Sequence, residues 1–202
     1  MHTLLVSLFS AEKEEQKIGE LEKNNYFKNF DLSKLKRHKP PKNESLETFR
    51  EIKNLSKTKS NLNFVKDNDD IIKVFDDFSK KNNLIFPKEK LKEMSLDAYD
   101  NVIKKLKYHF NRPRPKELAK QYGVDLDDVK LKSMNTPSYP SGHSVQGRFI
   151  ANYLNDLNGT RAFTELGDNI SYSRNVAKAH YESDSRFGKK IGDMLYNYIK
   201  NK

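Results

Sequence analysis

Apolar residues recur every three or four positions along most of this chain, which is the spacing of amphipathic helices. The pattern predicts helices over 45–55 and 67–81, with inward residues such as Leu46, Phe49 and Ile52 in the first of them. A longer helix is predicted from Pro87, a residue suited to a first helical turn, to about Phe110. Its predicted core positions are Leu91, Met94, Ala98, Val102 and Leu106.

The second half of the chain continues the helical pattern after a polar connection over 116–139. A helix is predicted over 141–157, with Ser141 as its N-cap and Gly159 closing it. Its apolar positions repeat every four residues, at Val145, Phe149, Tyr153 and Leu157. Two further helices are predicted over 160–180 and 184–199, separated near the sequence YESD.

Strand-type alternation is scarce and there are no internal repeats, so we predict an all-α, single-domain helical bundle over 1–202. The clearest break is HKPPKNES at 38–45, which has two prolines followed by good capping residues. We therefore expect 1–44 to be an N-terminal helical arm, with a helix over 1–24, that wraps the main body.

The formal net charge of +10 favours anionic partners, although most of the excess is lysine scattered among asparagine. The absence of cysteine excludes disulfides and thiolate metal sites. No apolar run approaches the roughly 18–20 residues that span a bilayer, so we expect a soluble protein without a transmembrane segment. The apolar stretch at 4–11 fits either a weak signal peptide, which implies a periplasmic or secreted protein, or the start of a buried helix in a cytoplasmic one. The sequence does not decide between a monomer and a homodimer.

Three short stretches between 100 and 200 carry the candidate chemistry: KYHFNRPRP (107–115), YPSGH (139–143) and SRNVAKAHYESD (173–184). A phosphoryl group in transfer spreads negative charge over three oxygens, so a site without metal or cofactor must surround it with fixed cations and N–H donors. The cations would come from three side chains, and Ser141 with the backbone around Gly142 would add donors at a helix start. The three cations are Lys107, Arg114 and Arg174.

Two histidines in these stretches suit the covalent and proton-transfer steps. His180 precedes Asp184 by four residues, so the carboxylate can hold one ring nitrogen protonated and leave the other as a nucleophile. His143 would then protonate the leaving oxygen and later activate water. His2, His38 and His109 match no pattern, and we assign them to the surface or to structural roles.

Taken together, the three stretches resemble the signature of the phosphatidic acid phosphatase type 2 superfamily, which includes bacterial class A acid phosphatases and vanadium haloperoxidases. Its fixed positions are all present in order: Lys107, Arg114, Pro115, Pro140, Ser141, Gly142, His143, Ser173, Arg174, His180 and Asp184. The resemblance covers 107–192 and says little about 1–100. It implies the helical fold of that superfamily and a metal-independent acid phosphatase that hydrolyses phosphate monoesters through a phosphohistidine on His180. It implies that Asp184 orients His180 and that His143 is the acid–base.

The first stretch can be aligned with the signature in two ways, because Lys105 with Arg112 has the same spacing as Lys107 with Arg114. We prefer the second pair, since relatives often carry a further arginine two positions earlier. The prolines after both arginines disfavour helical angles there, so only the fold can bring Lys107 and Arg114 together.

Two alternatives differ in function. A vanadate-dependent haloperoxidase would use the same anion cradle, although such enzymes are usually far longer. A basic anion-binding or nucleic-acid-binding protein would carry a vestigial site, but no nucleic-acid-binding motif is recognisable and we expect no specific nucleic-acid partner. The expected partner is a phosphorylated small molecule, and its class, whether nucleotide, sugar phosphate, diphosphate or lipid phosphate, stays open.

Overall fold

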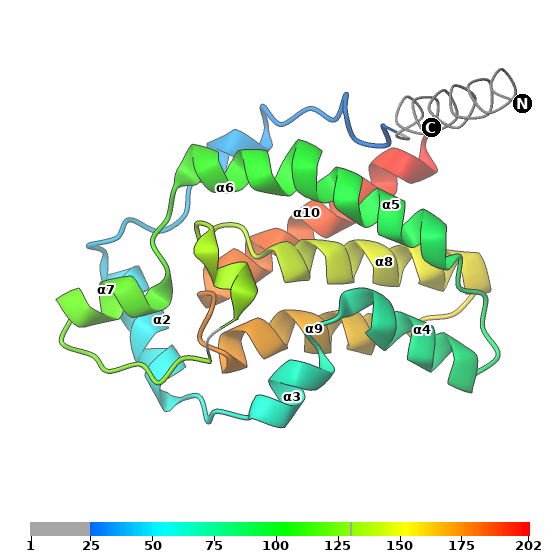
Figure 1. The fold of residues 1–202 in the computed structure, drawn as a ribbon. Helices are drawn as coiled ribbons and strands as arrows, with labels where there is room; N and C mark the ends of the chain where they lie inside the picture. Colours follow the sequence, from blue (N-terminus) through cyan, green and yellow to red (C-terminus); the bar gives the residue numbers. More distant parts are fainter. Residues whose placement is uncertain (1–24, 130) are drawn as a thin grey trace, which may run out of the picture.

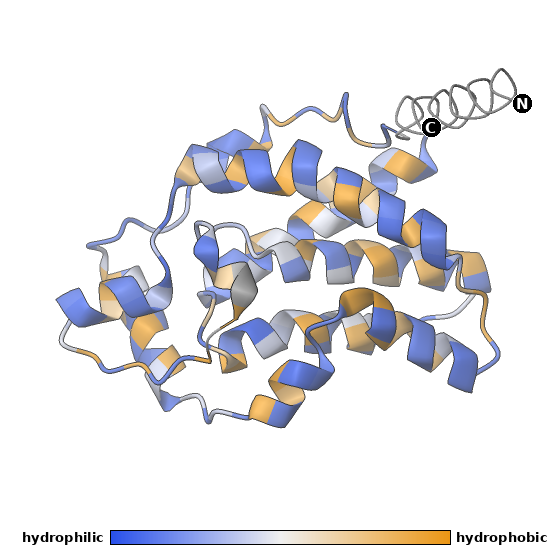
Figure 2. Ribbon diagram, in the orientation of Figure 1, coloured by the Kyte–Doolittle hydropathy of each residue, from blue (hydrophilic) through white to orange (hydrophobic). Residues whose placement is uncertain are grey.

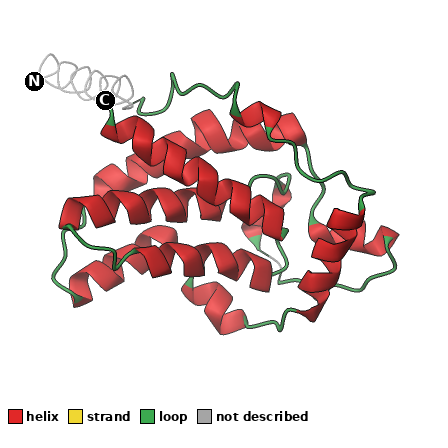
Figure 3. Cartoon of the chain, turned by 180° about the vertical axis from the view of Figure 1, so that it is seen from behind, coloured by secondary structure: helices red, strands yellow, loops and turns green. Residues whose placement is uncertain are grey.

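The computed structural model describes residues 25–129 and 131–202 of the protein. Within these residues all regular structure is helical and there is no strand, as Figure 3 shows, so the all-α prediction is confirmed. The helix predicted over 1–24 lies outside the described residues. No helix in the described part is both long and apolar enough to cross a membrane.

The helices follow one another along the chain with short connections (Figure 1). They are η1 (Leu35–Arg37), α2 (Leu46–Lys57), α3 (Leu62–Asp67), α4 (Ile71–Lys81), α5 (Lys88–Ala98), the π-helical segment η2 (Tyr99–Ile103), α6 (Lys104–Phe110), α7 (Pro115–Gln121), η3 (Lys132–Asn135), α8 (Gly142–Asn158), α9 (Thr164–Val176) and α10 (Glu182–Lys200).

Helix α8 forms the centre of the bundle and packs along both α9 and α10. Two glycines let the backbone of α10 approach α8 closely. A Cβ atom at Gly192 would lie 2.6 Å from the carbonyl oxygen of Val145, and one at Gly188 would lie 2.7 Å from that of Ser141. The N-terminus of α8 is therefore held directly against the first turns of α10, and Ser141 N–H also donates to the carbonyl of Asp184 at 3.1 Å.

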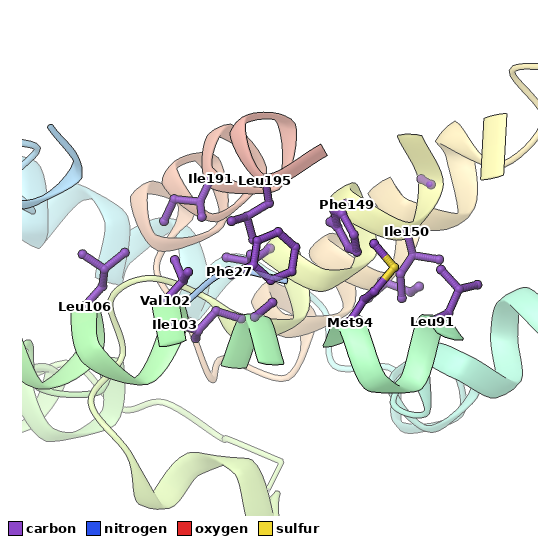
Figure 4. Close-up of a cluster of buried hydrophobic side chains, with 14 of the residues drawn as sticks. Phe27, Leu91, Met94, Val102, Ile103, Leu106, Phe149, Ile150, Ile191 and Leu195 are labelled. Carbon is purple, nitrogen blue, oxygen red and sulfur yellow. The ribbon is translucent and has the colours of Figure 1, made fainter. Parts of the chain in front are cut away.

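The long helical run α5–η2–α6 lies across this centre and supplies much of the core (Figure 4). All five of its predicted core positions are fully buried. Figure 2 shows the apolar residues on the inner faces of these helices and the polar residues outside, which is the pattern that burial of one face requires.

Only two of the four apolar positions predicted to face the core on α8 are buried. Val145 and Phe149 are buried, but Tyr153 is half-buried and Leu157 is 40% exposed, while Leu154 is fully buried. Four residues turn a helix by about 400°, so a strict four-residue repeat drifts about 40° per step and leaves the core face. Leu46 at the start of α2, also predicted to be core, is 61% exposed.

The described part of the N-terminal arm, residues 25–44, is not an α-helix. Apart from the short 3₁₀ helix η1 it consists of bends, turns and irregular backbone, and it is held by long-range contacts: Phe27 packs edge-on against Phe149, and Tyr139 Oη donates to the carbonyl of His38 at 2.9 Å. The side chains of the bundle fix this segment, and its two prolines cannot continue a helix. The prediction of a helical arm over 1–44 is therefore wrong for residues 25–44.

Other boundaries differ from the prediction as well: the helix predicted over 67–81 begins at Ile71, after the separate helix α3, and the one predicted over 160–180 begins at Thr164. The polar connection 116–139 contains a short helix, α7, which starts with Pro115 in the first helical position. The last two helices are separated by residues 177–181, earlier than YESD, and Lys178 in this turn has a left-handed backbone with φ of 56°. His180 consequently lies in a turn and not on a helix.

Candidate active site

His180 is fixed through both of its ring nitrogens. Nδ1 lies 3.2 Å from Asp184 Oδ2, and Nε2 lies 3.0 Å from Nη1 of Arg114. A carboxylate accepts and a guanidinium donates, so the proton is on Nδ1 and Nε2 carries the lone pair. Burial, together with the positive charges of Arg114 and Lys107, holds the pKa of His180 well below its usual range. The ring is therefore neutral, with Nε2 free of a proton.

Asp184 can accept from His180 Nδ1 because it lies in the first turn of α10, three residues after the N-cap residue Tyr181. Its Oδ2 also accepts from the Tyr181 N–H at 3.1 Å, and its Oδ1 accepts from Arg112 at 2.7 Å. Burial raises the pKa of Asp184, and these donors oppose the shift.

The fold brings Lys107 and Arg114 close to one another and to His180, as the sequence predicted it would have to. Lys107 Nζ donates to the carbonyl of Pro137 at 2.6 Å, and Arg114 Nε donates to that of Thr136 at 2.8 Å. Burial and the neighbouring Arg114 lower the pKa of Lys107 to about 7, and burial lowers that of Arg114 to about 10. One loop thus orients both cations, and Asn111, with φ of 46°, turns the chain between them.

The two possible alignments of the first motif place their residues differently. Lys105 is exposed and bonds Asn101 on the surface of the bundle, whereas Lys107 is buried beside Arg114. Arg112 is buried as well, but it faces the carboxylates of Glu51 and Asp184. The geometry therefore favours Lys107 with Arg114 as the pair next to His180.

His143 and Arg174 form the second part of the site, and Asp69 joins them. Arg174 Nη1 donates to Asp69 Oδ1 at 2.6 Å and lies 3.4 Å from His143 Nε2. That nitrogen is also 3.2 Å from the carbonyl oxygen of Asp69, an acceptor to which a protonated Nε2 can donate. Burial lowers the pKa of His143, and Asp69 opposes this shift; the bond with His143 in turn lowers the pKa of Asp69.

Ser141 and Gly142 are where the sequence predicts them, at the start of α8. Ser141 is the N-cap, and its Oγ accepts from Ser144 N–H at 3.4 Å and from Ser144 Oγ at 2.9 Å. The first intrahelical bond is donated by Val145, so the N–H groups of Gly142 and His143 precede it. A Cβ atom at Gly142 would make an ordinary 3.5 Å contact with Ile103, so packing alone does not require glycine there.

The assembled site is a buried cluster of positive charge. Four of its members are almost inaccessible: Lys107 (3% exposed), Arg114 (5%), Arg174 (1%) and His180 (4%). Cations held this close together in a low-dielectric environment favour an anion strongly. In the described part of the chain no group of three or more His, Asp or Glu side chains is arranged to hold a metal ion.

Three residues of this region were not predicted. Asp69 stands in DNDD (67–70), which reads as a helix-capping run, and Asp70 does cap α4. Glu51 is a polar position on α2, and Arg112 was considered only as an alternative to Arg114. Nothing in their spacing indicates contact with the motif residues, because those contacts are long-range. Tyr139, the first residue of the YPSGH motif, stacks on Phe187 in the core.

Comparison with models of known protein families and with curated proteins found no match for this chain.

Proposed function

We propose that this protein is a metal-independent phosphatase that hydrolyses the phosphate monoester of a small molecule through a phosphohistidine on His180. The observation that carries the proposal is the pattern of bonds on His180. A neutral imidazole, protonated on Nδ1 by its contact with Asp184 and with its Nε2 lone pair inside a cationic cluster, is equipped for nucleophilic attack on phosphorus. The resemblance of the three motifs to the phosphatidic acid phosphatase type 2 superfamily, and the all-α fold, agree with it.

In the first step, His180 Nε2 attacks phosphorus, the P–N bond forms and the bond from phosphorus to the leaving oxygen breaks. Arg114, which donates to Nε2 before the reaction, then donates to a phosphoryl oxygen instead. Lys107 and Arg174 balance the remaining negative charge of the phosphoryl group. Asp184 stabilises the positive imidazole ring that results. His143 gives its proton to the leaving oxygen, which departs as the alcohol.

In the second step, water attacks the phosphorus of phosphohistidine and His143 accepts its proton. The P–N bond breaks, which returns the lone pair to Nε2 and releases inorganic phosphate. Asp69 takes part as a positioning residue, because its carboxylate holds Arg174 and raises the pKa of His143 against the effect of burial.

The first test is hydrolysis of p-nitrophenyl phosphate by the purified protein with EDTA present. We expect turnover that EDTA does not diminish and that orthovanadate inhibits competitively, because vanadate adopts the geometry of the phosphoryl transition state. Turnover that requires an added divalent metal would contradict the proposal. Bromide oxidation on addition of vanadate, without phosphatase activity, would favour the haloperoxidase, and salt-sensitive nucleic-acid binding alone would favour a vestigial site.

The pH dependence of kcat/KM should place the optimum on the acidic side of neutrality. Lys107 and His143 both act in the protonated form, and a lowered pKa means that this form is lost at a lower pH than usual. The pKa of Lys107 is lowered to about 7, and that of His143 lies below its ordinary 6.5, so we expect a maximum below pH 6.5 and a steep decline above 7. His180 remains neutral there because its pKa is lowered further.

Asp69→Asn sharpens this test, with Asp67→Asn, an exposed neighbour in the same segment, as its control. Without the Asp69 carboxylate the pKa of His143 falls, so the decline on the alkaline side should move to lower pH in Asp69→Asn and stay in place in Asp67→Asn. An optimum above pH 8 in the native protein, or a shift of the decline to higher pH in Asp69→Asn, would contradict these roles.

A further inference from the structure

Arg112 is buried between two carboxylates that come from opposite halves of the chain. Its Nη1 donates to Asp184 Oδ1 at 2.7 Å, and its Nη2 donates to Glu51 Oε2 at 3.0 Å. The guanidinium also lies over the ring of Tyr181, 3.7 Å from its centroid, and 2% of Arg112 is exposed. Glu51 belongs to α2, outside the motifs, and is itself buried. We call Glu51, Arg112 and Asp184 the carboxylate–arginine cluster.

Glu51 makes two more bonds, both to the first turn of α10. Its Oε1 accepts from the N–H of Ser183 at 2.6 Å and its Oε2 accepts from Ser183 Oγ at 2.9 Å. Asp184 accepts from the N–H of Tyr181 in the same turn. Two carboxylates thus hold neighbouring N–H groups at the positive end of one helix, which fixes the position of Asp184 relative to the bundle.

The charges of the cluster matter for His180. Arg112 contributes one positive charge, and Glu51 and Asp184 contribute two negative ones, so the cluster carries a net charge of −1 beside a neutral His180. If Arg112 faced Asp184 alone, its charge would neutralise the carboxylate that bonds His180 Nδ1. Because Glu51 shares Arg112, the negative charge of Asp184 stays available to the imidazole ring.

The other charged groups near His180 make that negative charge important. Those facing it from the surrounding elements are Lys107 on α6, Arg114 before α7, His143 on α8 and Arg174 on α9. Each disfavours a positive charge on the ring, whereas a phosphoryl group on Nε2 requires the ring to become positive. Asp184 is the carboxylate bonded to the ring, and it can offset these cations only while Arg112 is balanced elsewhere.

We propose that Glu51 is a positioning residue of the active site, which balances Arg112 so that Asp184 can stabilise the charged form of His180. The inference rests on the proposed function for its catalytic consequence. Its effect on the His180–Asp184 hydrogen bond is independent of any reaction. It gives α2, in the part of the chain that the motifs do not cover, a defined role in the chemistry.

The test compares Glu51→Gln with Glu47→Gln, which removes the same charge from an exposed position of the same helix. The first readout is the downfield NMR resonance of the His180 Nδ1 proton. We expect it to move upfield in Glu51→Gln, because a more fully neutralised Asp184 is a weaker acceptor, and to stay in place in Glu47→Gln. The second readout is turnover: kcat should fall about tenfold in Glu51→Gln with KM little changed, and both should be unchanged in Glu47→Gln.

Glu51→Asp keeps the negative charge on a shorter side chain, so it distinguishes the effect of losing the charge from the effect of disturbing the structure. It should retain most of kcat and leave the His180 resonance close to its native position, even if Glu51→Gln folds poorly. Equal losses in Glu51→Asp and Glu51→Gln, or a resonance that neither variant moves, would overturn the inference. A shifted resonance in a protein without phosphatase activity would support the role of Glu51 and overturn the proposed function.

Discussion

Replacing His180 with alanine should lower kcat for aryl phosphate hydrolysis by about 10,000-fold or more, because the reaction we propose loses its nucleophile. Within residues 25–129 and 131–202, the other histidine of the site does not share this arrangement: His143 Nε2 faces the carbonyl oxygen of Asp69 at 3.2 Å. The native protein, quenched with base during turnover of a labelled phosphate ester, should yield a phosphoramidate that is stable to base and labile to acid. His180→Ala should yield none.

The matched control is His109→Ala, which removes an exposed histidine from α6 and should leave kcat unchanged. Circular dichroism and thermal unfolding should show that both variants retain the fold. His180 is buried, so a modest loss of stability is expected in its variant, but it should not alter the helical signal. Residual activity of His180→Ala within tenfold of the native protein, or an equal loss in His109→Ala, would contradict the assignment of the nucleophile.

Replacing Arg112 with alanine should lower the free energy of unfolding by about 3–5 kcal/mol, the range for breaking a buried ion pair from one side. The variant leaves the carboxylates of Glu51 and Asp184 buried and facing each other without a cation. It also removes the guanidinium that covers the Tyr181 ring. Urea unfolding at neutral pH, with the midpoint and the slope both fitted, measures the loss.

Arg186→Ala is the control for this change, because Arg186 is on α10 with 66% of its side chain exposed and has a loose pair with Glu182 at 3.8 Å. Such surface pairs contribute about 0–1 kcal/mol, so a small change is expected. The penalty in Arg112→Ala should shrink in acid, where the two carboxylates become protonated and no longer repel. A loss in Arg112→Ala no larger than that in Arg186→Ala would show that the carboxylate–arginine cluster does not stabilise the fold.

The longer helices of this protein follow from local chemistry and were therefore predictable, whereas the short helices α3 and α7 were not predicted. Ser45 and Ser141 cap α2 and α8 through their side chains, and Gly159 ends α8 in a left-handed conformation. The run from Pro87 to Phe110 buries the residues that its periodicity marks. The errors arose where local signals are weak: a four-residue repeat misassigned Leu157, and the turn that contains His180 was taken for helix.

The sequence by itself determined the helical class, the caps and the set of candidate groups, because each depends on residues within a turn or two of one another. It did not determine which groups would meet. Asp69 and Arg174 are 105 positions apart, and Glu51 and Ser183 are 132 apart, yet each pair is joined by a hydrogen bond of 2.6 Å. Buried charges need compensating partners, but any acidic residue could in principle supply one. Only the packing of α10 against α8, with α2 beside the first turn of α10, decided that Arg112 bonds both Glu51 and Asp184 and that Asp184 also bonds His180.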